Sequence, residues 1–274
     1  MDSPYDDLDR RPLDAAALRR ALVTAESLWR EVVVVDETGS TNSDLAAEAR
    51  AGAEDGLVLV AEHQQHGRGR LDRSWTAPPR AAVTFSVLVR PAGLPTGRWP
   101  WMPLLTGVAV CEAVRRHCEV GATLKWPNDV MVEDRKLAGI LLERVDAGDG
   151  TPAAVIGVGL NVSSRPDELP VPEATSLALE GASTTDRTVV LRQILRTFEW
   201  LYWGWLVSGG DSAGGLAVSY AERCSTLGRR VRVEMTTGEP VEGIARRVDP
   251  DGRLVVATDA GETAVGAGDV VHLR

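Results

Sequence analysis

The chain has 274 residues, 44% hydrophobic and 25% charged, so it can bury a substantial core and still form a second, small module. Its formal net charge of -9 argues against a nucleic-acid-binding surface as its main role. Its three cysteines are widely spaced, and this spacing matches neither a disulfide framework nor a zinc site. The acidic segment 1–7 is no signal peptide, and no apolar run is long enough to cross a bilayer, so we expect a cytoplasmic protein.

Arginine is strongly favoured over lysine in this chain. Of its 30 basic residues, only Lys125 and Lys136 are lysines. A chain that uses arginine almost everywhere keeps lysine where the chemistry needs a compact ammonium group, which a guanidinium group does not replace. The two lysines therefore mark the segment that contains them as a candidate site.

The N-terminal part is predicted to form two helices and two strands. Asp14 is suited to cap a helix over 15–29. Four consecutive valines favour a buried strand over 31–36, and an alanine-rich helix is predicted over 44–50. A second strand is predicted over 56–62.

A polar turn, 38–43, connects the first strand to the alanine-rich helix. It contains Ser40, Thr41 and Asn42. A helix N-terminus presents free backbone N–H groups, so hydroxyl and amide side chains there are well placed to contact a small ligand. Plain N-capping is the alternative for these residues, and taken alone it is the commoner role.

The segment 62–75 is the densest cluster of functional side chains. It contains two glycines and three arginines just before a tryptophan, namely Gly67, Arg68, Gly69, Arg70, Arg73 and Trp75. Glycine lets the backbone approach a ligand closely, arginine binds phosphate or carboxylate, and tryptophan offers a face for stacking. We expect a loop that becomes ordered around an anionic, partly planar ligand; a solvated basic turn is the alternative.

A second dense segment, 123–130, contains Lys125, Asn128 and Asp129. Pro127 favours an extended backbone at the residue before it, and the next two residues predict a turn ahead of a short strand. The regular elements around this segment are predicted as a strand over 81–90, a helix over 101–118, and strands over 136–143 and 153–162. In the last strand Gly157 and Gly159 share one face, which suits the floor of a pocket.

The C-terminal part begins with two helices, over 186–207 and 216–224. The first contains three tryptophans that we expect to pack inside the domain: Trp200, Trp203 and Trp205. Residues 228–274 differ in character, because short strands alternate with turns rich in glycine and aspartate. This pattern predicts a small five-stranded barrel of SH3 type, and its marginal core predicts that it docks on the larger domain.

Five motifs together resemble those of the biotin protein ligases, the biotin–[acetyl-CoA-carboxylase] synthetases. In chain order they are Gly39-Ser40-Thr41-Asn42, Gly67-Arg68-Gly69-Arg70 through Trp75, Lys125-Trp126-Pro127-Asn128-Asp129, Lys136-Leu137-Ala138-Gly139-Ile140-Leu141 and Gly157-Val158-Gly159-Leu160-Asn161. Each motif alone is weak, but all five occur in the order and spacing of the family. The final barrel also resembles the family's C-terminal module.

The resemblance implies an α/β (α+β) catalytic domain with a mixed sheet, related to the class II tRNA-synthetase core, over residues 1–226. A C-terminal SH3-like β-barrel over 227–274 completes the implied fold. The implied reaction has two steps: the biotin carboxylate attacks the α-phosphate of ATP, giving biotinyl-5′-AMP, and a lysine of a biotin carboxyl carrier domain of acyl-CoA carboxylase then takes the biotinyl group. Mg²⁺ is implied to accompany ATP, without a dedicated metal site.

The resemblance also implies roles for individual residues. Lys136 and Arg68 match the catalytic positions. Biotin-binding positions are matched by Ser40, Thr41, Asn42, Gln64, Gly67, Arg68, Gly69, Arg70, Lys136 and Gly139. Positions that bind ATP or the adenylate are matched by Arg70, Arg73, Trp75, Lys125, Asn128, Asp129 and Asn161. Three roles remain open for Asp129: it places Mg²⁺, orients basic neighbours or caps a turn.

Two loop residues depart from the family pattern. His66 stands where a small residue is usual, and we interpret it as tolerated. Asp72 stands where glycine is usual; a carboxylate there either weakens anion binding or pairs with Arg70 or Arg73, which leaves the role of Arg73 open. The stretch before Ser40 is too short for the DNA-binding domain of some relatives. We therefore expect a monofunctional ligase that binds neither DNA nor membrane, as a monomer or weak homodimer.

Three alternatives follow from the same residues. A lipoate–protein ligase shares the fold and the adenylate chemistry, although the two central motifs favour biotin. A biotin sensor without catalysis would bind biotin but would not exchange pyrophosphate with ATP, and the retained Lys136 speaks against it. The third alternative is that the C-terminal barrel acts as an independent interaction module, and the small size of the barrel speaks against this role.

Overall fold

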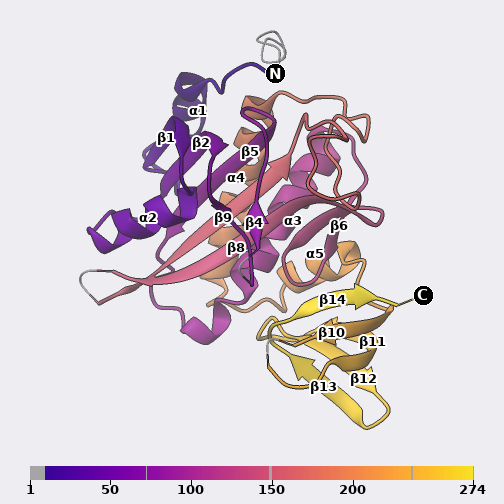
Figure 1. Ribbon diagram of the computed structural model, residues 1–274. Helices are drawn as coiled ribbons and strands as arrows, with labels where there is room; N and C mark the ends of the chain where they lie inside the picture. Colours follow the sequence, from indigo (N-terminus) through magenta and orange to yellow (C-terminus); the bar gives the residue numbers. More distant parts are fainter. Residues whose placement is uncertain (1–9, 72, 148–149, 236, 274) are drawn as a thin grey trace.

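The computed structural model describes residues 10–71, 73–147, 150–235 and 237–273 (Figure 1). Seven strands form one mixed sheet in the order β1-β2-β5-β9-β8-β7-β6. In that order their bounds are Glu31–Thr38, Leu57–Gln64, Ala82–Val89, Pro152–Asn161, Arg135–Asp146, Asp129–Val132 and Ala122–Lys125. Strands β1 and β2 pair in parallel, whereas the other neighbours are antiparallel. The predicted mixed sheet is confirmed.

Helices cover both faces of this sheet. Their bounds are α1 Ala15–Leu22, α2 Thr41–Arg50, α3 Trp101–His117, α4 Arg187–Val207 and α5 Leu216–Arg223, with a 3₁₀ turn η1 at Thr96–Arg98. Figure 1 shows α3 and α4 behind the sheet, where the main apolar core lies. Helix α2 contacts β2, β5, β8 and β9, and a second, smaller core lies beneath it. The sheet face that carries α2 is the one that builds the site.

The two N-terminal helices differ from their predicted lengths. Helix α1 ends at Leu22, seven residues before the predicted end. There Ser27 Oγ accepts from the Thr24 backbone N–H at 3.0 Å, and such local hydroxyl bonds compete with helix. Helix α2 begins at Thr41, three residues earlier than predicted, because Ser40 caps it and accepts from Ser43 N. Its first turn therefore carries the polar residues predicted as a loop.

The prediction that all three tryptophans of α4 pack inside was wrong for two of them. Trp205 is buried, whereas Trp200 is 74% exposed and Trp203 is 44% exposed. Phe198, Tyr202 and Trp205 take the inward face of the helix. At 100° per residue, Trp200 and Trp203 then point outward.

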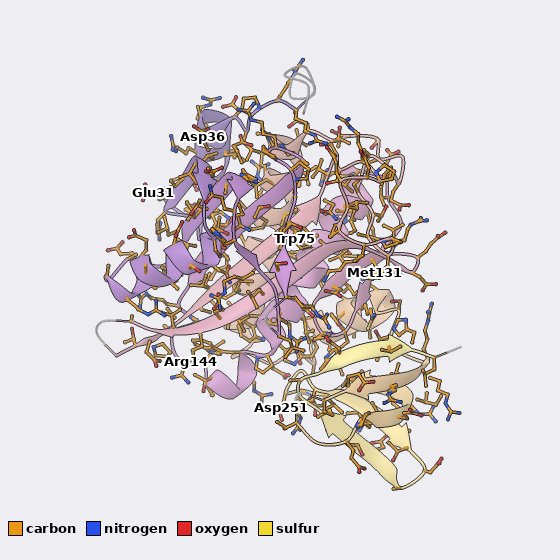
Figure 2. All side chains as sticks on the ribbon, in the orientation of Figure 1. Glu31, Asp36, Trp75, Met131, Arg144 and Asp251 are labelled. Atoms are coloured by element: carbon orange, nitrogen blue, oxygen red, sulfur yellow. The ribbon has the colours of Figure 1, made fainter. Side chains whose placement is uncertain are left out.

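The C-terminal module is a five-stranded antiparallel sheet in the order β13-β12-β11-β10-β14. The bounds of β10 to β14 are Arg230–Glu234, Val241–Val248, Leu254–Thr258, Gly261–Val265 and Asp269–His272. The module docks on the larger domain as expected: Trp101 Nε1 donates to Pro250 O at 2.9 Å, and Trp126 Nε1 donates to Gly252 O at 3.1 Å. Asp251, labelled in Figure 2, lies in the same docking turn.

Two further observations concern the length of the helices and the state of the cysteines. Among the described residues, no helix combines the length and the apolarity that a membrane span requires. The three cysteines are buried as free thiols. Burial raises the pKa of Cys111 to about 12 and that of Cys118 to about 11, which makes both poor nucleophiles.

Candidate active site

A cavity of about 110 Å³ opens on the α2-bearing face of the sheet. Most of the predicted site residues line it: Ser40, Thr41, Asn42, Gln64, Arg68, Gly69, Arg70, Arg73, Trp75, Asn128, Asp129, Lys136 and Gly139. The volume is below the roughly 300–1,000 Å³ of ligand pockets.

The indole of Trp75 lines this cavity and rests on a floor made of two glycines. Gly139 in β8 and Gly159 in β9 are directly opposite each other in the antiparallel register. A Cβ on Gly159 would lie 2.3 Å from Trp75 Cε2, and one on Gly139 would lie 3.5 Å from Trp75 Cζ3. Figure 2 shows Trp75 in front of the middle of the sheet. Its Nε1 is buried without a hydrogen-bond partner among the described residues, so the indole keeps a free donor.

The arginine loop has its own small scaffold. Strand β3, Gly67–Arg68, pairs antiparallel with β4, Ser74–Trp75. Gly69 N also donates to Arg73 O at 2.6 Å. This hairpin holds Trp75 over the sheet and directs the arginines to the cavity mouth. The predicted influence of Asp72 falls outside the described residues.

A hydrogen-bonded chain connects the start of α2 to the sheet. Gln64 Oε1 accepts from the backbone N and the Oγ1 of Thr41, at 2.8 and 2.9 Å. Ser86 Oγ lies 2.7 Å from Thr41 Oγ1 and donates to Asn42 Oδ1 at 2.6 Å. The oxygen end of Gln64 is thereby fixed, and its Nε2 is placed beside Gly67. These side chains are held in set orientations, as a specific binding site requires.

Three of the four cations at the cavity have carboxylate partners. Arg68 Nη1 lies 2.8 Å from Glu143 Oε1, and Lys136 Nζ lies 2.7 Å from Asp129 Oδ1. The third pair joins Arg73 of the loop to Asp269 at the start of β14. Through this pair the C-terminal module reaches the cavity.

Arg70 is the exception among the four cations. Its Nη1 donates to the neutral Asn128 Oδ1 at 3.1 Å, and no ion pair joins it to a carboxylate in the described part of the chain. Burial lowers the pKa of Arg70, while the more distant charges of Asp129 and Asp269 oppose that shift. A partly buried cation that no carboxylate pairs directly within the described residues favours the entry of an anion.

The backbone positions Lys136 next to the cavity. The β7–β8 register shifts between Val130 and Met131, and the latter is paired with Lys136. Such bulges redirect side chains beside active sites. The segment 173–175 holds the backbone of Lys136 on the side away from β7. The N–H of Lys136 donates to Glu173 O at 2.6 Å, and the Lys136 carbonyl oxygen accepts from Thr175 N at 2.9 Å.

The sequence comparisons agree on one family. A profile of the biotin/lipoate A/B protein ligase family matches residues 34–161, and a profile of the biotin protein ligase C-terminal domain matches residues 226–273. The biotin–[acetyl-CoA-carboxylase] ligase of Mycobacterium tuberculosis is 45% identical over 269 residues, which cover 97% of each chain. The chain belongs to the biotin protein ligase family. The bifunctional ligase/repressor BirA of Bacillus subtilis is 30% identical, over 94% of this chain and 78% of that one.

Solved structures give the same result. The biotin protein ligase of Aquifex aeolicus in complex with biotin and ATP superposes with a TM-score of 0.75 at 25% identity. The match covers 90% of this chain and 100% of that one. The expected family and fold, with the SH3-like C-terminal module, are thus confirmed.

Three residues predicted for the site of this ligase do not line its cavity. Gly67 is paired with Trp75 within the hairpin, where a Cβ would be 2.3 Å from Trp75 O. Asn161 is buried and donates from Nδ2 to Thr175 O at 2.9 Å. Lys125 lines a separate hollow with Arg229 and His272, because β14 of the C-terminal module lies against that part of the sheet.

Sequence reasoning missed several residues that line the cavity of the ligase: Ser74, Thr84, Phe85, Ile140, Leu141, Gly157, Val158, Gly159 and Asp269. The two glycines had been predicted as a pocket floor, although not as binding residues. Strand alternation from Gly139 reaches Leu141 and then Glu143, so this face could have been found from the sequence. Asp269 carries no such signal, because Arg73, its partner in the site, lies 196 residues away in the sequence.

Proposed function

We propose that this ligase activates biotin as biotinyl-5′-AMP and transfers the biotinyl group to a lysine of a biotin carboxyl carrier domain of acyl-CoA carboxylase. The observation that carries the proposal is the convergence of Arg68, Arg70 and Lys136 on one cavity with a glycine floor. Both substrates of the first step are anions, so their approach requires fixed positive charge. The family membership supports the choice of biotin.

In the first step a biotin carboxylate oxygen bonds to the α-phosphorus of ATP, and pyrophosphate leaves with the electrons of the broken P–O bond. Arg70 supplies the cation that no carboxylate pairs directly within the described chain. Lys136 is held by Asp129, and its ammonium group can exchange this partner for the reacting oxygens. Asp129 thus orients the lysine, one of the roles that the sequence left open.

Biotin occupies the side of the cavity near α2 in this proposal. Ser40, Thr41, Asn42 and Gln64 contact its polar head group. The fixed orientation of Gln64 presents the amide NH₂ as a donor, which suits a ureido carbonyl oxygen. Gly139 removes steric cover above β8, Gly69 lines the cavity from the loop, and Gly67 lets β3 pack closely against β4.

The adenylate occupies the side of the cavity near the hairpin. Trp75 provides an indole face and a free Nε1 donor. Asn128 acts through Arg70, since its Nδ2 is already engaged with Ile140 O at 2.8 Å. Asn161 acts by holding the segment that contains Thr175. Arg73 closes the loop onto Asp269, and Lys125 contributes only long-range positive charge.

Mg²⁺ enters in this proposal with ATP, as part of the substrate. No group of three or more potential metal ligands of the His, Cys, Asp and Glu types exists among the described residues. The carboxylates that line the cavity, Asp129 and Asp269, both have cationic partners. The ATP phosphates therefore supply most of the ligands of the metal.

In the second step the carrier lysine amine attacks the acyl carbon of the mixed anhydride, loses a proton and displaces AMP. We propose that the ligase acts as a monomer or a weakly associated dimer. We propose residues 1–226 as the catalytic domain and 227–274 as the SH3-like module. We propose the cytoplasm as the place of the reaction.

The test is transfer of biotin to a purified carrier domain with ATP and Mg²⁺, read by mass spectrometry. A matched carrier with its target lysine replaced by arginine serves as the control. We expect a single biotinyl group on the first carrier and none on the second. Transfer of lipoate instead of biotin, under the same conditions, would move the activity to the lipoate ligases.

A further inference from the structure

The β6–β7 turn, residues 126–128, holds both cations to which the proposed first step gives a role. Asn128 lies in the turn, and its Oδ1 accepts from Arg70 Nη1 at 3.1 Å. Asp129 follows at the start of β7, and its Oδ1 lies 2.7 Å from Lys136 Nζ. A shift of this turn would therefore move the partners of both cations together.

The side chain of Trp126, the first residue of the β6–β7 turn, is anchored in the C-terminal module. The residue is only 1% exposed. Its Nε1 donates to Gly252 O at 3.1 Å, in the docking turn of the module, residues 250–252. A buried indole N–H without an acceptor costs stability, so this bond limits where the ring can lie. The backbone N of Trp126 is held as well, because it donates to Thr226 Oγ1 at 3.2 Å.

Strand β8 holds only the later part of the same turn. Ile140 N donates to Asn128 O at 3.0 Å, Asn128 Nδ2 donates to Ile140 O at 2.8 Å, and Asp129 is paired with Gly139. A hollow of about 510 Å³ lies beside the turn, and its lining includes Asn128 and Trp126. A segment that borders a hollow has few packing contacts on that side, so a separate anchor is needed to keep it in place.

We propose that Trp126 is a positioning residue, through which the C-terminal module holds the β6–β7 turn and with it the two cations of the first step. The indole touches no substrate; it acts on Arg70 and Lys136 through the residues that follow it in the turn. The inference rests on the proposed function, because that function gives these two cations their role. It assigns the docked module a task in adenylation that is separate from the pair of Arg73 with Asp269.

The test compares Trp126→Phe with Trp101→Phe. Both variants keep a buried ring and lose an indole N–H that donates to the docking turn, since Trp101 Nε1 donates to Pro250 O at 2.9 Å. They differ in position, because Trp101 begins α3 and is not among the described residues that line the cavity. We expect similar drops in melting temperature, because each variant loses one bond between the domains. A difference in activity between the two then reports on the β6–β7 turn.

In biotin-dependent ATP–pyrophosphate exchange, Trp126→Phe should lower kcat roughly three- to tenfold, as the loss of one hydrogen bond predicts. The KM for biotin should stay near that of the wild type, because Thr41 and Gln64 keep their own bonds on the head-group side. A fall in kcat without a rise in KM is the mark of groups that act on the transition state. Trp101→Phe should lower kcat far less.

A second pair of variants tests the same anchor from the module. Gly252 has φ +78°, and a Cβ there would lie 3.2 Å from Pro100, so Gly252→Ala displaces the acceptor of the indole. Gly261→Ala is the matched control, because Gly261 also has a positive φ, +123°, but its Cβ would meet nothing within 4 Å. Gly252→Ala should lower kcat as Trp126→Phe does, whereas Gly261→Ala should not. In the double mutant the losses from Gly252→Ala and Trp126→Phe should not multiply, because both act on one bond.

Three results would overturn the inference: equal kcat in Trp126→Phe and Trp101→Phe, a loss that appears only as a higher KM for biotin, or losses that multiply in the double mutant. If Trp126→Phe is unfolded at the assay temperature, the comparison of Gly252→Ala with Gly261→Ala decides by the same criteria. Absence of biotin-dependent exchange in the wild-type protein would instead refute the proposed function. The two failures are therefore distinguishable.

Discussion

Gly159→Ala tests the geometry of the site most sharply, because its effect can be worked out from the structure. The added Cβ would lie 2.3 Å from Trp75 Cε2 and 2.6 Å from Trp75 Nε1. Ordinary carbon contacts are about 3.5–4.0 Å, so the indole or a ligand in its place must rise by more than about 1 Å. Overpacking of this kind costs about 1–3 kcal/mol. We expect kcat/KM to fall roughly 5- to 150-fold, since each 1.4 kcal/mol is tenfold.

The assay is ATP–pyrophosphate exchange with biotin varied at saturating ATP, and then with ATP varied at saturating biotin. Gly121→Ala is the matched control, because a Cβ at Gly121 would meet nothing within 4 Å and the residue is exposed. The clash with Trp75 is also present without ligand, so the melting temperature of Gly159→Ala should fall as well, and the kinetics are compared at a temperature well below it. Wild-type kinetics in Gly159→Ala would refute the glycine floor as a binding surface.

The remaining predictions use the same assays. Lys136→Arg keeps the charge but not the compact ammonium group beside Asp129, and should slow adenylation roughly 100-fold; an unimpaired variant would contradict the role of lysine. Asp269→Asn frees Arg73 and should slow adenylation roughly 2- to 5-fold with an unchanged melting temperature, as the loss of an exposed pair predicts; a large drop in stability would show a structural role instead. Burial, Lys125 and Arg229 lower the pKa of His272 from 6.5 to about 4. Between pH 6.5 and 4 the unfolded chain therefore binds more protons than the folded chain, so the free energy of unfolding should fall as the pH drops through this range. His272→Gln should flatten this pH dependence of the melting temperature. A parallel pH dependence in both proteins would rule out His272 as the cause.

The local chemistry of the site was predictable from the sequence. Glycines before a tryptophan predict a close approach of the backbone, and alternating glycines in a strand predict a floor. The register that sets Gly139 opposite Gly159 joins the two motifs, and it follows from the pairing of β8 with β9. Scarcity of lysine pointed correctly to Lys136 as a cavity residue.

The same argument from scarcity failed for Lys125. Its neighbour Leu124 packs towards Gly107 of α3, so alternation does turn Lys125 to the cavity side of the sheet. The C-terminal module lies against that stretch, however, and places His272 and Arg229 beside the lysine. Whether Lys125 lines the cavity is decided by the docking of the two domains, and no local sequence pattern encodes that docking.

Long-range ion pairs were equally hidden from sequence patterns. The partner of Arg73 is 196 residues away, and Glu143 meets both Arg68 and Asn42 only because the hairpin and α2 fold onto one sheet face. Each of these contacts depends on tertiary placement. Sequence patterns therefore identified the groups that bind ligands better than the carboxylates that position them.

The most direct test of the central claim is ATP–pyrophosphate exchange measured in parallel with biotin, with lipoate and without added acid. The account predicts exchange with biotin alone, because adenylation of the biotin carboxylate is reversible at this site. Exchange with lipoate alone would contradict the substrate assignment while leaving the adenylating site in place. Tight biotin binding without exchange would contradict the central claim, because it would make the protein a biotin sensor.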